Sequence, residues 1–217
     1  MEIKNTQQLK EASKTKSPFL TMEQGKNKLR IVSKIFGVKE HNIKIKDQPR
    51  MIACPEAMEQ WEAEVADRTV NRSVKCPICE SGDRKVKTQF MALAITDKGD
   101  VGVLKKGPTV FSTITELKEE GYELSKTFIV ITRKGEGLET EYSVIPSKEE
   151  KELTDEEKNQ ILDFMKDFDL ERRSKPMSYE NIVRKLKGED PIFTKEEQGP
   201  EIGGHAEDLP PVPEENY

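Results

Sequence analysis

The spacing of the three cysteines and one of the two histidines is the feature that most constrains the fold of this chain. Twelve residues separate His41 from Cys54, and twenty-one more separate Cys54 from a Cys-Pro-Ile-Cys sequence that begins at Cys76 and ends at Cys79. Two thiolates of such a turn can reach one metal ion, and a third thiolate and an imidazole complete the closed tetrahedral shell of structural zinc. The pattern therefore predicts one structural zinc ion bound by these four residues. The alternative is three reduced cysteines and a surface histidine.

Composition indicates that part of the chain lies outside a hydrophobic core. Apolar residues make up 34% and charged residues 35% of the 217 positions, whereas a typical globular chain is about half apolar and about a quarter charged. No stretch approaches the ~18 apolar residues of a membrane span, and the first residues lack the apolar segment of a signal peptide. With its thiols on a metal ion, the chain is expected in a reducing, cytoplasmic compartment.

Charge is distributed unevenly along the sequence. Residues 1–50 carry 12 Lys and Arg against 5 Asp and Glu, whereas residues 188–217 carry 1 against 9. The overall net charge of −5 therefore does not exclude nucleic acid as a partner, because the N-terminal part is basic enough to suit an anion. Charge runs are also common on solvated surfaces, so the asymmetry supports this interpretation only together with other features.

Hydrophobic periodicity divides the chain into a mainly β region followed by helices. Residues 1–18 are polar and Lys-rich and are expected to form a flexible arm. A Gly-rich turn at 133–137 and a turn at 97–100 separate predicted strands. His41 is expected at the start of its strand. The predicted strands are 28–36, 42–46, 86–95, 101–104, 109–111, 127–132 and 140–145.

Four helices are also predicted. The segment 56–70 follows Cys54 and has Met58, Trp61 and Val65 on one side. Ser/Thr followed three residues later by Glu is typical of a capping box, which opens a helix. The remaining predicted helices are 112–117, opened by Thr113 and Glu116, 154–168, opened by Thr154 and Glu157, and 178–187, ended by Gly188. The order of elements predicts a mainly β, α+β fold: a small barrel or sandwich carrying a zinc subdomain.

Catalytic motifs are lacking in this sequence. Neither histidine lies in a recognisable Ser/His/Asp or Cys/His setting, and there is no Walker-type Gly-Lys-Ser/Thr loop. The Gly135-x-Gly137 sequence follows a strand but precedes another strand, so it lacks the helix of a dinucleotide site. A zinc ion with four protein ligands would have no open position for water. We therefore expect a protein that is not an enzyme.

Basic residues next to strand aromatics favour single-stranded nucleic acid as the ligand. Cations contact the phosphates of such strands while aromatic rings stack on the bases. The alternative for each aromatic residue is a place in the core, and the cations at turns are the better candidates. The predicted contacts are Lys28, Arg30, Arg84, Lys85, Lys87, Phe90, Lys105, Lys106, Phe111, Arg133, Lys134 and Tyr142, with Lys34, Phe36 and Phe128 in the same clusters.

The acidic C-terminal stretch, residues 189–217, has too few apolar residues to offset the entropy of ordering and is expected to be disordered. Its carboxylates could compete with DNA for a basic groove, or the stretch could dock on partner proteins through Leu209, Val212 and Tyr217. A solubilising tail is the remaining alternative.

The motifs together resemble those of the zinc-containing single-stranded DNA-binding proteins of tailed bacteriophages. The resemblance rests on the Cys3His order, on Glu23–Ile31, and on the strand-turn-strand of Ile129–Gly137 and Thr140–Val144. It covers about residues 19–146 and the acidic end. It implies an OB-fold core over 19–146 with a zinc subdomain at about 41–82. The helical segment at 147–188 is predicted from the sequence pattern after Pro146. The resemblance also implies cooperative binding to single-stranded DNA in phage replication, recombination and repair, with the tail recruiting partner proteins in the host cytoplasm.

Two other classes remain open on the residues alone. A zinc-ribbon transcription or replication accessory factor would act mainly through protein contacts, and would bind DNA weakly. A zinc-stabilised assembly protein would have no nucleic-acid role, although Lys and Arg at the turns of the predicted strands argue against it. Self-association on single-stranded DNA is a further partner interaction that the resemblance implies.

Overall fold

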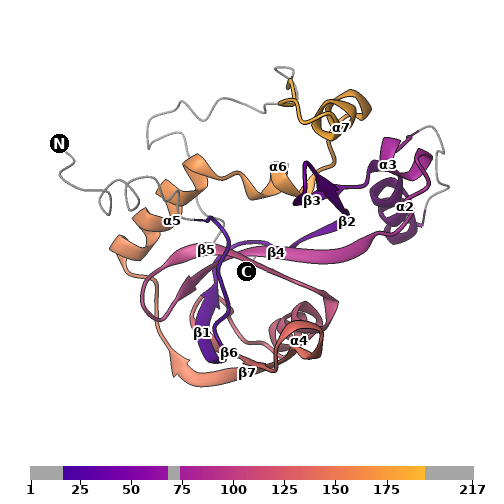
Figure 1. The fold of residues 1–217 in the computed structure, drawn as a ribbon. Helices are drawn as coiled ribbons and strands as arrows, with labels where there is room; N and C mark the ends of the chain where they lie inside the picture. The colour runs from indigo at the N-terminus through magenta and orange to yellow at the C-terminus, as the bar shows by residue number, and fades with distance from the viewer. Residues whose placement is uncertain (1–16, 68–73, 194–217) are drawn as a thin grey trace, which may run out of the picture.

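A computed structural model of the chain describes residues 17–67 and 74–193. The described part is a mixed α+β fold with a seven-stranded, mostly antiparallel sheet and six α-helices (Figure 1). The elements in chain order are β1 (Gly25–Ile31), β2 (Phe36–Ile45), β3 (Gln48–Ala53), α2 (Pro55–Val65), α3 (Pro77–Glu80), β4 (Lys87–Thr96), β5 (Val101–Lys106), α4 (Pro108–Glu119), β6 (Thr127–Lys134), the 3-10 turn η1 (Gly137–Glu139), β7 (Glu141–Glu150), α5 (Asp155–Asp167), α6 (Leu170–Ser174) and α7 (Tyr179–Leu186).

The sheet is built around β4, which pairs with β5, β2 and β1. After α4 the chain returns as β6, which lies on the other side of β1 and continues into β7. The spatial order β6-β1-β4-β5 is that of a Greek key, in which the fourth strand lies beside the first. The β2–β3 hairpin extends the sheet away from this part. Because no pairing joins β5 to β7 within the described residues, the sheet is open.

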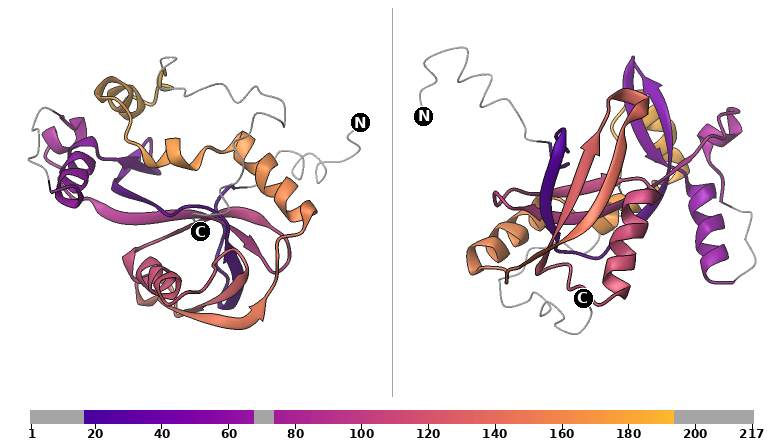
Figure 2. Two further views of the ribbon diagram at one scale, coloured as in Figure 1. Left: turned by 180° about the vertical axis from the view of Figure 1, so that it is seen from behind. Right: turned by 90° about the horizontal axis from the view of Figure 1, so that it is seen from below.

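Strand β4 is buried on both faces, which explains the continuous apolar run in its sequence. Ala92 and Ala94 face a core that α4 closes with Phe111 and Ile114. On the opposite face, alternate residues including Leu93 pack against α5 and α6. Two further views show α4 on one side of β4 and the α5–α6 pair on the other (Figure 2). We call strands β1, β4, β5, β6 and β7 together with α4 the barrel-like part. It has an inner core under α4 and an outer core under α5 and α6.

Helix α5 is joined to the sheet by a buried ion pair. The Arg30 guanidinium on β1 is 0% exposed and lies 2.7 Å from the Glu157 carboxylate at the start of α5. Glu157 also completes the capping box with Thr154, as the sequence predicted. Burial alone would raise the pKa of Glu157, but bonds from the Thr154 amide, Arg30 and Lys151 hold it at about 2. A charged contact thus sets the position of the C-terminal helices.

Most predicted elements are present, with some differences in their limits. The predicted strand at 28–36 is two strands, because the chain leaves the sheet after Ile31 and re-enters at Phe36. His41 consequently lies in the middle of β2 and not at its start. Strand β7 continues to Glu150, beyond the predicted end of the β region at 146. Val65 is 78% exposed, so it does not share the buried side of α2 with Met58.

The predicted strand at 109–111 is wrong, since these residues form the first turns of α4. Pro108 at the N-terminal end of the helix needs no hydrogen-bond partner for its nitrogen, and Gly107 precedes it in an extended conformation. Val110, Ile114 and Leu117 are buried at helical spacing. Thr113, predicted to open a helix, lies inside α4, where its hydroxyl donates to the Thr109 carbonyl.

The chain is ordered slightly beyond the predicted limits at both ends. Pro18 accepts a hydrogen bond from the Val103 amide, so the predicted arm reaches β5 at its last residue. Near the other end, Asn181 exchanges two hydrogen bonds of 2.8 Å with the backbone of Ile192. The predictions of a flexible arm and a disordered tail otherwise concern 1–16 and 194–217, which lie outside the described residues. Within the described ranges, no helix has the length and apolar character needed to cross a membrane.

Candidate metal centre and nucleic-acid interface

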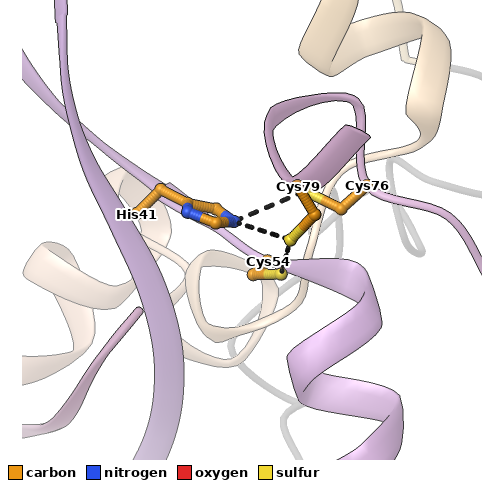
Figure 3. A group of neighbouring side chains, drawn as sticks. All are labelled: His41, Cys54, Cys76 and Cys79. Atoms are coloured by element: carbon orange, nitrogen blue, oxygen red, sulfur yellow. Dashed lines mark hydrogen bonds between the residues drawn. The ribbon is translucent and has the colours of Figure 1, made fainter. Parts of the chain in front are cut away.

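The four predicted metal ligands come together in one buried cluster (Figure 3). The Nε2 atom of His41 lies 3.5 Å from the Sγ atoms of both Cys76 and Cys79, and Cys54 Sγ lies 3.6 Å from Cys79 Sγ. All four ligand atoms lie within 4.8 Å of one another. Tetrahedral zinc, with bonds of ~2.3 Å to sulfur and ~2.0 Å to nitrogen, places ligand atoms about 3.6 Å apart. The cluster is therefore compatible with one zinc ion.

A hydrogen bond from the ring nitrogen that does not face the sulfurs fixes the orientation of His41. Its Nδ1 atom lies 3.1 Å from the Lys85 carbonyl oxygen, which can only accept a hydrogen bond. The Nδ1 atom must therefore carry the proton, which leaves the lone pair of Nε2 directed at the sulfurs. Such a bond from a ligand histidine to a carbonyl is the usual second contact at metal sites.

The cysteines are presented by the N-terminal ends of two helices. Cys54 precedes α2, and its Sγ atom accepts a hydrogen bond from the Ala57 amide at 3.4 Å. Cys76 precedes α3, a single turn that places Cys79 back beside it. Amides at a helix N-terminus favour negative charge, so the start of α2 stabilises a thiolate at Cys54.

The chemistry of the cluster favours a bound cation. Burial raises the pKa of the Cys54 and Cys79 thiols, and the charge of Cys76 raises both further. Three thiolates cannot share a buried space unless a positive charge compensates them. A metal ion supplies that charge and releases the thiol protons as it binds.

Helix α7 covers the metal cluster, a contact that the sequence did not predict. Ile182 is 0% exposed and packs in one cluster with the three cysteines, and Met177 borders it. The Tyr179 hydroxyl donates a 2.8 Å hydrogen bond to the Glu80 carboxylate at the end of α3. We refer to the β2–β3 hairpin, α2, α3 and α7 as the metal module.

Two of the predicted nucleic-acid contacts are wrong because they lie in the interior. Arg30 is 0% exposed and bonds to Glu157 and to the Lys151 carbonyl. Phe111 is 2% exposed and belongs to the inner core. Phe128, from the same predicted clusters, is also buried, beneath the Lys28 and Arg30 cations. Sequence could not reveal the partner of Arg30, because Glu157 lies 127 positions away.

Several other predicted cations have partners within the fold. Lys105 forms an ion pair of 2.7 Å with the buried Glu40, and Lys28 forms one with Glu149. An Arg133 guanidinium nitrogen donates to the Met22 carbonyl at 2.9 Å. These residues have structural roles that compete with phosphate contacts.

One face of β2, β4 and β5 does bring predicted contacts together. Phe90 on β4 is directly opposite Lys106 on β5, so both side chains lie on the same face. The Lys106 ammonium lies 4.2 Å from the centre of the Tyr142 ring and 2.9 Å from the Tyr142 hydroxyl oxygen. All three side chains are partly exposed.

Two residues on this face were not among the predicted contacts. Trp61 on α2 meets the Phe90 ring edge-on, with 5.9 Å between the ring centres. The Lys39 ammonium lies 5.2 Å from the centre of the Trp61 ring. Gly37 lets the indole approach, because a Cβ atom there would lie 2.1 Å from the ring. The only tryptophan of the chain was the available signal, but its periodicity indicated only a buried side of the helix.

We call Lys39, Trp61, Phe90, Lys106 and Tyr142 the aromatic–cation strip. It runs from the metal module across β4 to the start of β7, with a cation beside Trp61 and another beside Tyr142. The remaining predicted cations, Arg84, Lys85, Lys87 and Lys134, are exposed, as is Lys34, while Phe36 borders the outer core. Lys87 lies opposite Glu40, on the other face of β4 from Phe90.

A cavity of about 380 Å³ adjoins the strip at Phe90. It lies against α4, and its lining includes Ile35 and Pro108 together with the carboxylates of Glu116 and Glu119. Its walls combine apolar surface with negative charge. Phosphate is therefore a poor ligand for the cavity itself.

Comparison with known proteins gives no family. No family model matches the chain, and no curated protein matches it.

Proposed function

We propose that the chain is a single-stranded DNA-binding protein in which one structural zinc ion holds the metal module. The observation that carries the proposal is the aromatic–cation strip. Rings that stack on bases and cations that contact phosphates are what single-stranded nucleic acid requires of a protein surface. Lys39 beside Trp61 and Lys106 beside Tyr142 supply this pairing twice on one face.

Zinc is the metal that the donor set supports. Three thiolates and one imidazole in a tetrahedral arrangement select zinc over the oxygen-binding cations magnesium and calcium. Four protein ligands leave no position for a substrate or for activated water, so the ion's role is to stabilise the module. His41, Cys54, Cys76 and Cys79 would hold it.

The topology supports an OB-like barrel. The OB-fold is a five-stranded, partly open Greek-key barrel whose face binds oligonucleotides. In this chain β1, β4, β5, β6 and β7 follow a Greek-key order, with α4 in the long connection. The Lys106–Tyr142 contact joins the ends of β5 and β7, where closure of such a barrel would occur. The β2–β3 hairpin, α2 and α3 of the metal module are then an insertion between the first and second barrel strands, and α7 packs on them from the C-terminal side.

The strip favours single strands over duplex. Stacking on Trp61 or Tyr142 requires an unpaired base whose face is free, and each stacked base contributes ~1–3 kcal/mol without regard to sequence. In the cell such a protein would coat and protect single strands during phage DNA replication, recombination and repair. The acidic segment 194–217 would recruit partner proteins.

The test is a titration of fluorescently labelled oligo-dT with the zinc-loaded protein at two salt concentrations, followed by anisotropy. We expect tight binding that weakens steeply with salt, because phosphate contacts release counterions. Duplex of equal length is the control and should bind far more weakly. Equal affinity for duplex, or no binding to oligo-dT at low salt, would contradict the proposal.

The cavity beside α4 supports a second candidate function, that of a replication or transcription accessory factor. Its apolar walls and the carboxylates of Glu116 and Glu119 suit a basic, apolar segment of a partner protein. Weak oligo-dT binding together with tight polymerase binding would favour this function over the first.

A further inference from the structure

The metal module carries a second group of cations on the side of α6 and α7. Lys46 lies at the tip of the β2–β3 hairpin, Arg50 on β3, Arg173 on α6 and Lys185 on α7. Both ribbon figures draw the hairpin next to α6 and α7 (Figures 1 and 2). We call these four residues the basic surface. None of them belongs to the aromatic–cation strip.

Backbone geometry brings the four cations together. Arg50 is directly opposite Ile43, so it lies on the face of the hairpin that carries Ile52 and His41 and that α7 covers. The Lys46 side chain lies against Gly188 just after α7, where a Cβ atom would come within 2.6 Å of the ammonium nitrogen. Helix α6 packs on β2, and the Arg173 guanidinium lies 4.8 Å from the Phe168 ring centre.

The charges of the basic surface are not compensated. Among the described residues, no carboxylate forms an ion pair with any of its four cations, whereas neighbouring Arg184 and Lys175 pair with Glu189 and Glu171. Burial lowers the pKa of Lys185, and the nearby Arg173 and Arg50 lower it further, against a weaker opposing effect of Asp190. Cations held close together with no carboxylate in an ion pair among the described residues are suited to an external anion.

We propose that Lys46, Arg50, Arg173 and Lys185 bind the phosphates of a single DNA strand, so that α6 and α7 belong to the nucleic-acid interface. This inference rests on the proposed function and extends it to a second surface. Lys39 of the strip and Ile43, the neighbour of Arg50, share one face of β2. The step of four residues from Lys39 to Ile43 spans about 13 Å along the β-strand. A single DNA strand could therefore contact the aromatic–cation strip at one end of the metal module and the basic surface at the other end, with the metal centre between them.

The experiment compares salt dependences of binding to a long oligo-dT. The triple variant Arg50→Ala, Arg173→Ala, Lys185→Ala should reduce the slope of log affinity against log salt by about 2, since each lost phosphate contact on a single strand removes about 0.7. A matched control replaces Lys98, Lys118 and Lys148 of the barrel-like part with Ala and should keep the slope, since these lysines are exposed and form no ion pair within the described ranges. The charge-preserving variant Arg50→Lys, Arg173→Lys, Lys185→Arg should also keep most of it.

Metal content and thermal melting establish that each variant is folded, so that a reduced slope reports the lost contacts. A slope that stays at the wild-type value in the folded triple variant overturns the basic surface and leaves the aromatic–cation strip standing. Equal losses in the triple variant and its matched control overturn it too, because the effect would then come from net charge alone. A wild-type protein that does not bind oligo-dT overturns the proposed function together with this inference.

Discussion

The barrel-like part and the metal module differ in what stabilises them. Among the described residues, the inner core under α4 contains thirteen buried residues and the outer core ten, almost all of them aliphatic or aromatic. The metal module has six buried residues in its core, of which three are the cysteines. Apart from the cysteines, that core cluster contains Ile52, Ile78 and Ile182 as its buried apolar residues within the described part of the chain. Burial of apolar surface can hold the first region but not the second.

This difference determines how the proposed interface responds to metal. The strip is shared between the regions, since Lys39 and Trp61 belong to the module while Phe90, Lys106 and Tyr142 belong to the barrel-like part. Loss of the metal should therefore unfold the part of the proposed interface that lies on the metal module and leave the barrel-like part folded. The comparison can be tested by changes that act on one region only.

The largest effect is expected from Cys76→Ser. Removing one ligand forfeits much of a metal-binding free energy of about 10–16 kcal/mol, which in small zinc modules is folding free energy. The variant should lose its zinc, and the amides of α2, α3 and α7 should exchange rapidly with deuterium while those of β4 and β6 remain protected. Metal analysis and hydrogen exchange check this prediction.

The matched control for this variant is Lys75→Ala, which removes an exposed neighbour of the same ligand. It should keep one zinc ion and full protection of α7. A Cys76→Ser protein that retained zinc and wild-type melting would refute the ligand assignment.

Phe111→Ala should have the reciprocal effect. It leaves a cavity in the inner core and is expected to cost about 3–5 kcal/mol of unfolding free energy. Urea denaturation monitored by circular dichroism measures this cost, and Phe111→Leu should cost less. Zinc stoichiometry should stay at one under native conditions. A Phe111→Ala variant with an unchanged free energy of unfolding would show that the inner core does not stabilise the barrel-like part.

Glu157→Gln should destabilise the attachment of α5 in a pH-dependent way. Since the pKa of Glu157 is about 2 in the fold and 4.5 as a reference, its contribution is complete above pH 4.5 and is lost as pH falls towards 2. The shift corresponds to about 3 kcal/mol. The free energy of unfolding of the wild type should decrease as the pH falls from 4.5 towards 2. That of the Glu157→Gln variant should decrease less, because the carboxylate that becomes protonated is absent. Identical pH profiles by urea denaturation would exclude this role for the ion pair.

The smallest effect is expected from the double variant Lys39→Ala, Lys106→Ala. Both residues are partly exposed, so stability should change little, while the salt slope of oligo-dT binding should fall by about 1.4. Lys98→Ala is the matched control. A slope that stays unchanged would place the phosphate contacts elsewhere.

Local signals in the sequence were sufficient for much of the fold. The knuckle at Cys76–Cys79, the capping box at Thr154 and Gly188 after α7 are determined by residues a few positions apart, and each is present in the structure. The first turn of α4 was missed although Pro108 is a local signal, because Thr109, Val110 and Phe111 are residues that favour strands. The cluster of four ligands followed from spacing and ligand chemistry.

Long-range partners could not be predicted in this way. Arg30 and Lys105 were taken as surface cations, but Glu157 and Glu40 neutralise them inside the fold. Trp61 joins the strip only because α2 is packed over Gly37, a contact set by tertiary structure. The sequence therefore predicted the types of residue on the strip, lysine and aromatic, better than the positions that come together.

The most direct test of the central claim uses Trp61, the only tryptophan of the chain. Its emission should be quenched when the zinc-loaded protein is titrated with unlabelled oligo-dT, because a base stacked on the indole changes its surroundings, and added salt should restore it. The control is duplex of equal length, which should leave the emission unchanged. Unchanged Trp61 emission at oligo-dT concentrations that saturate binding by anisotropy would contradict the strip as the site of single-stranded DNA.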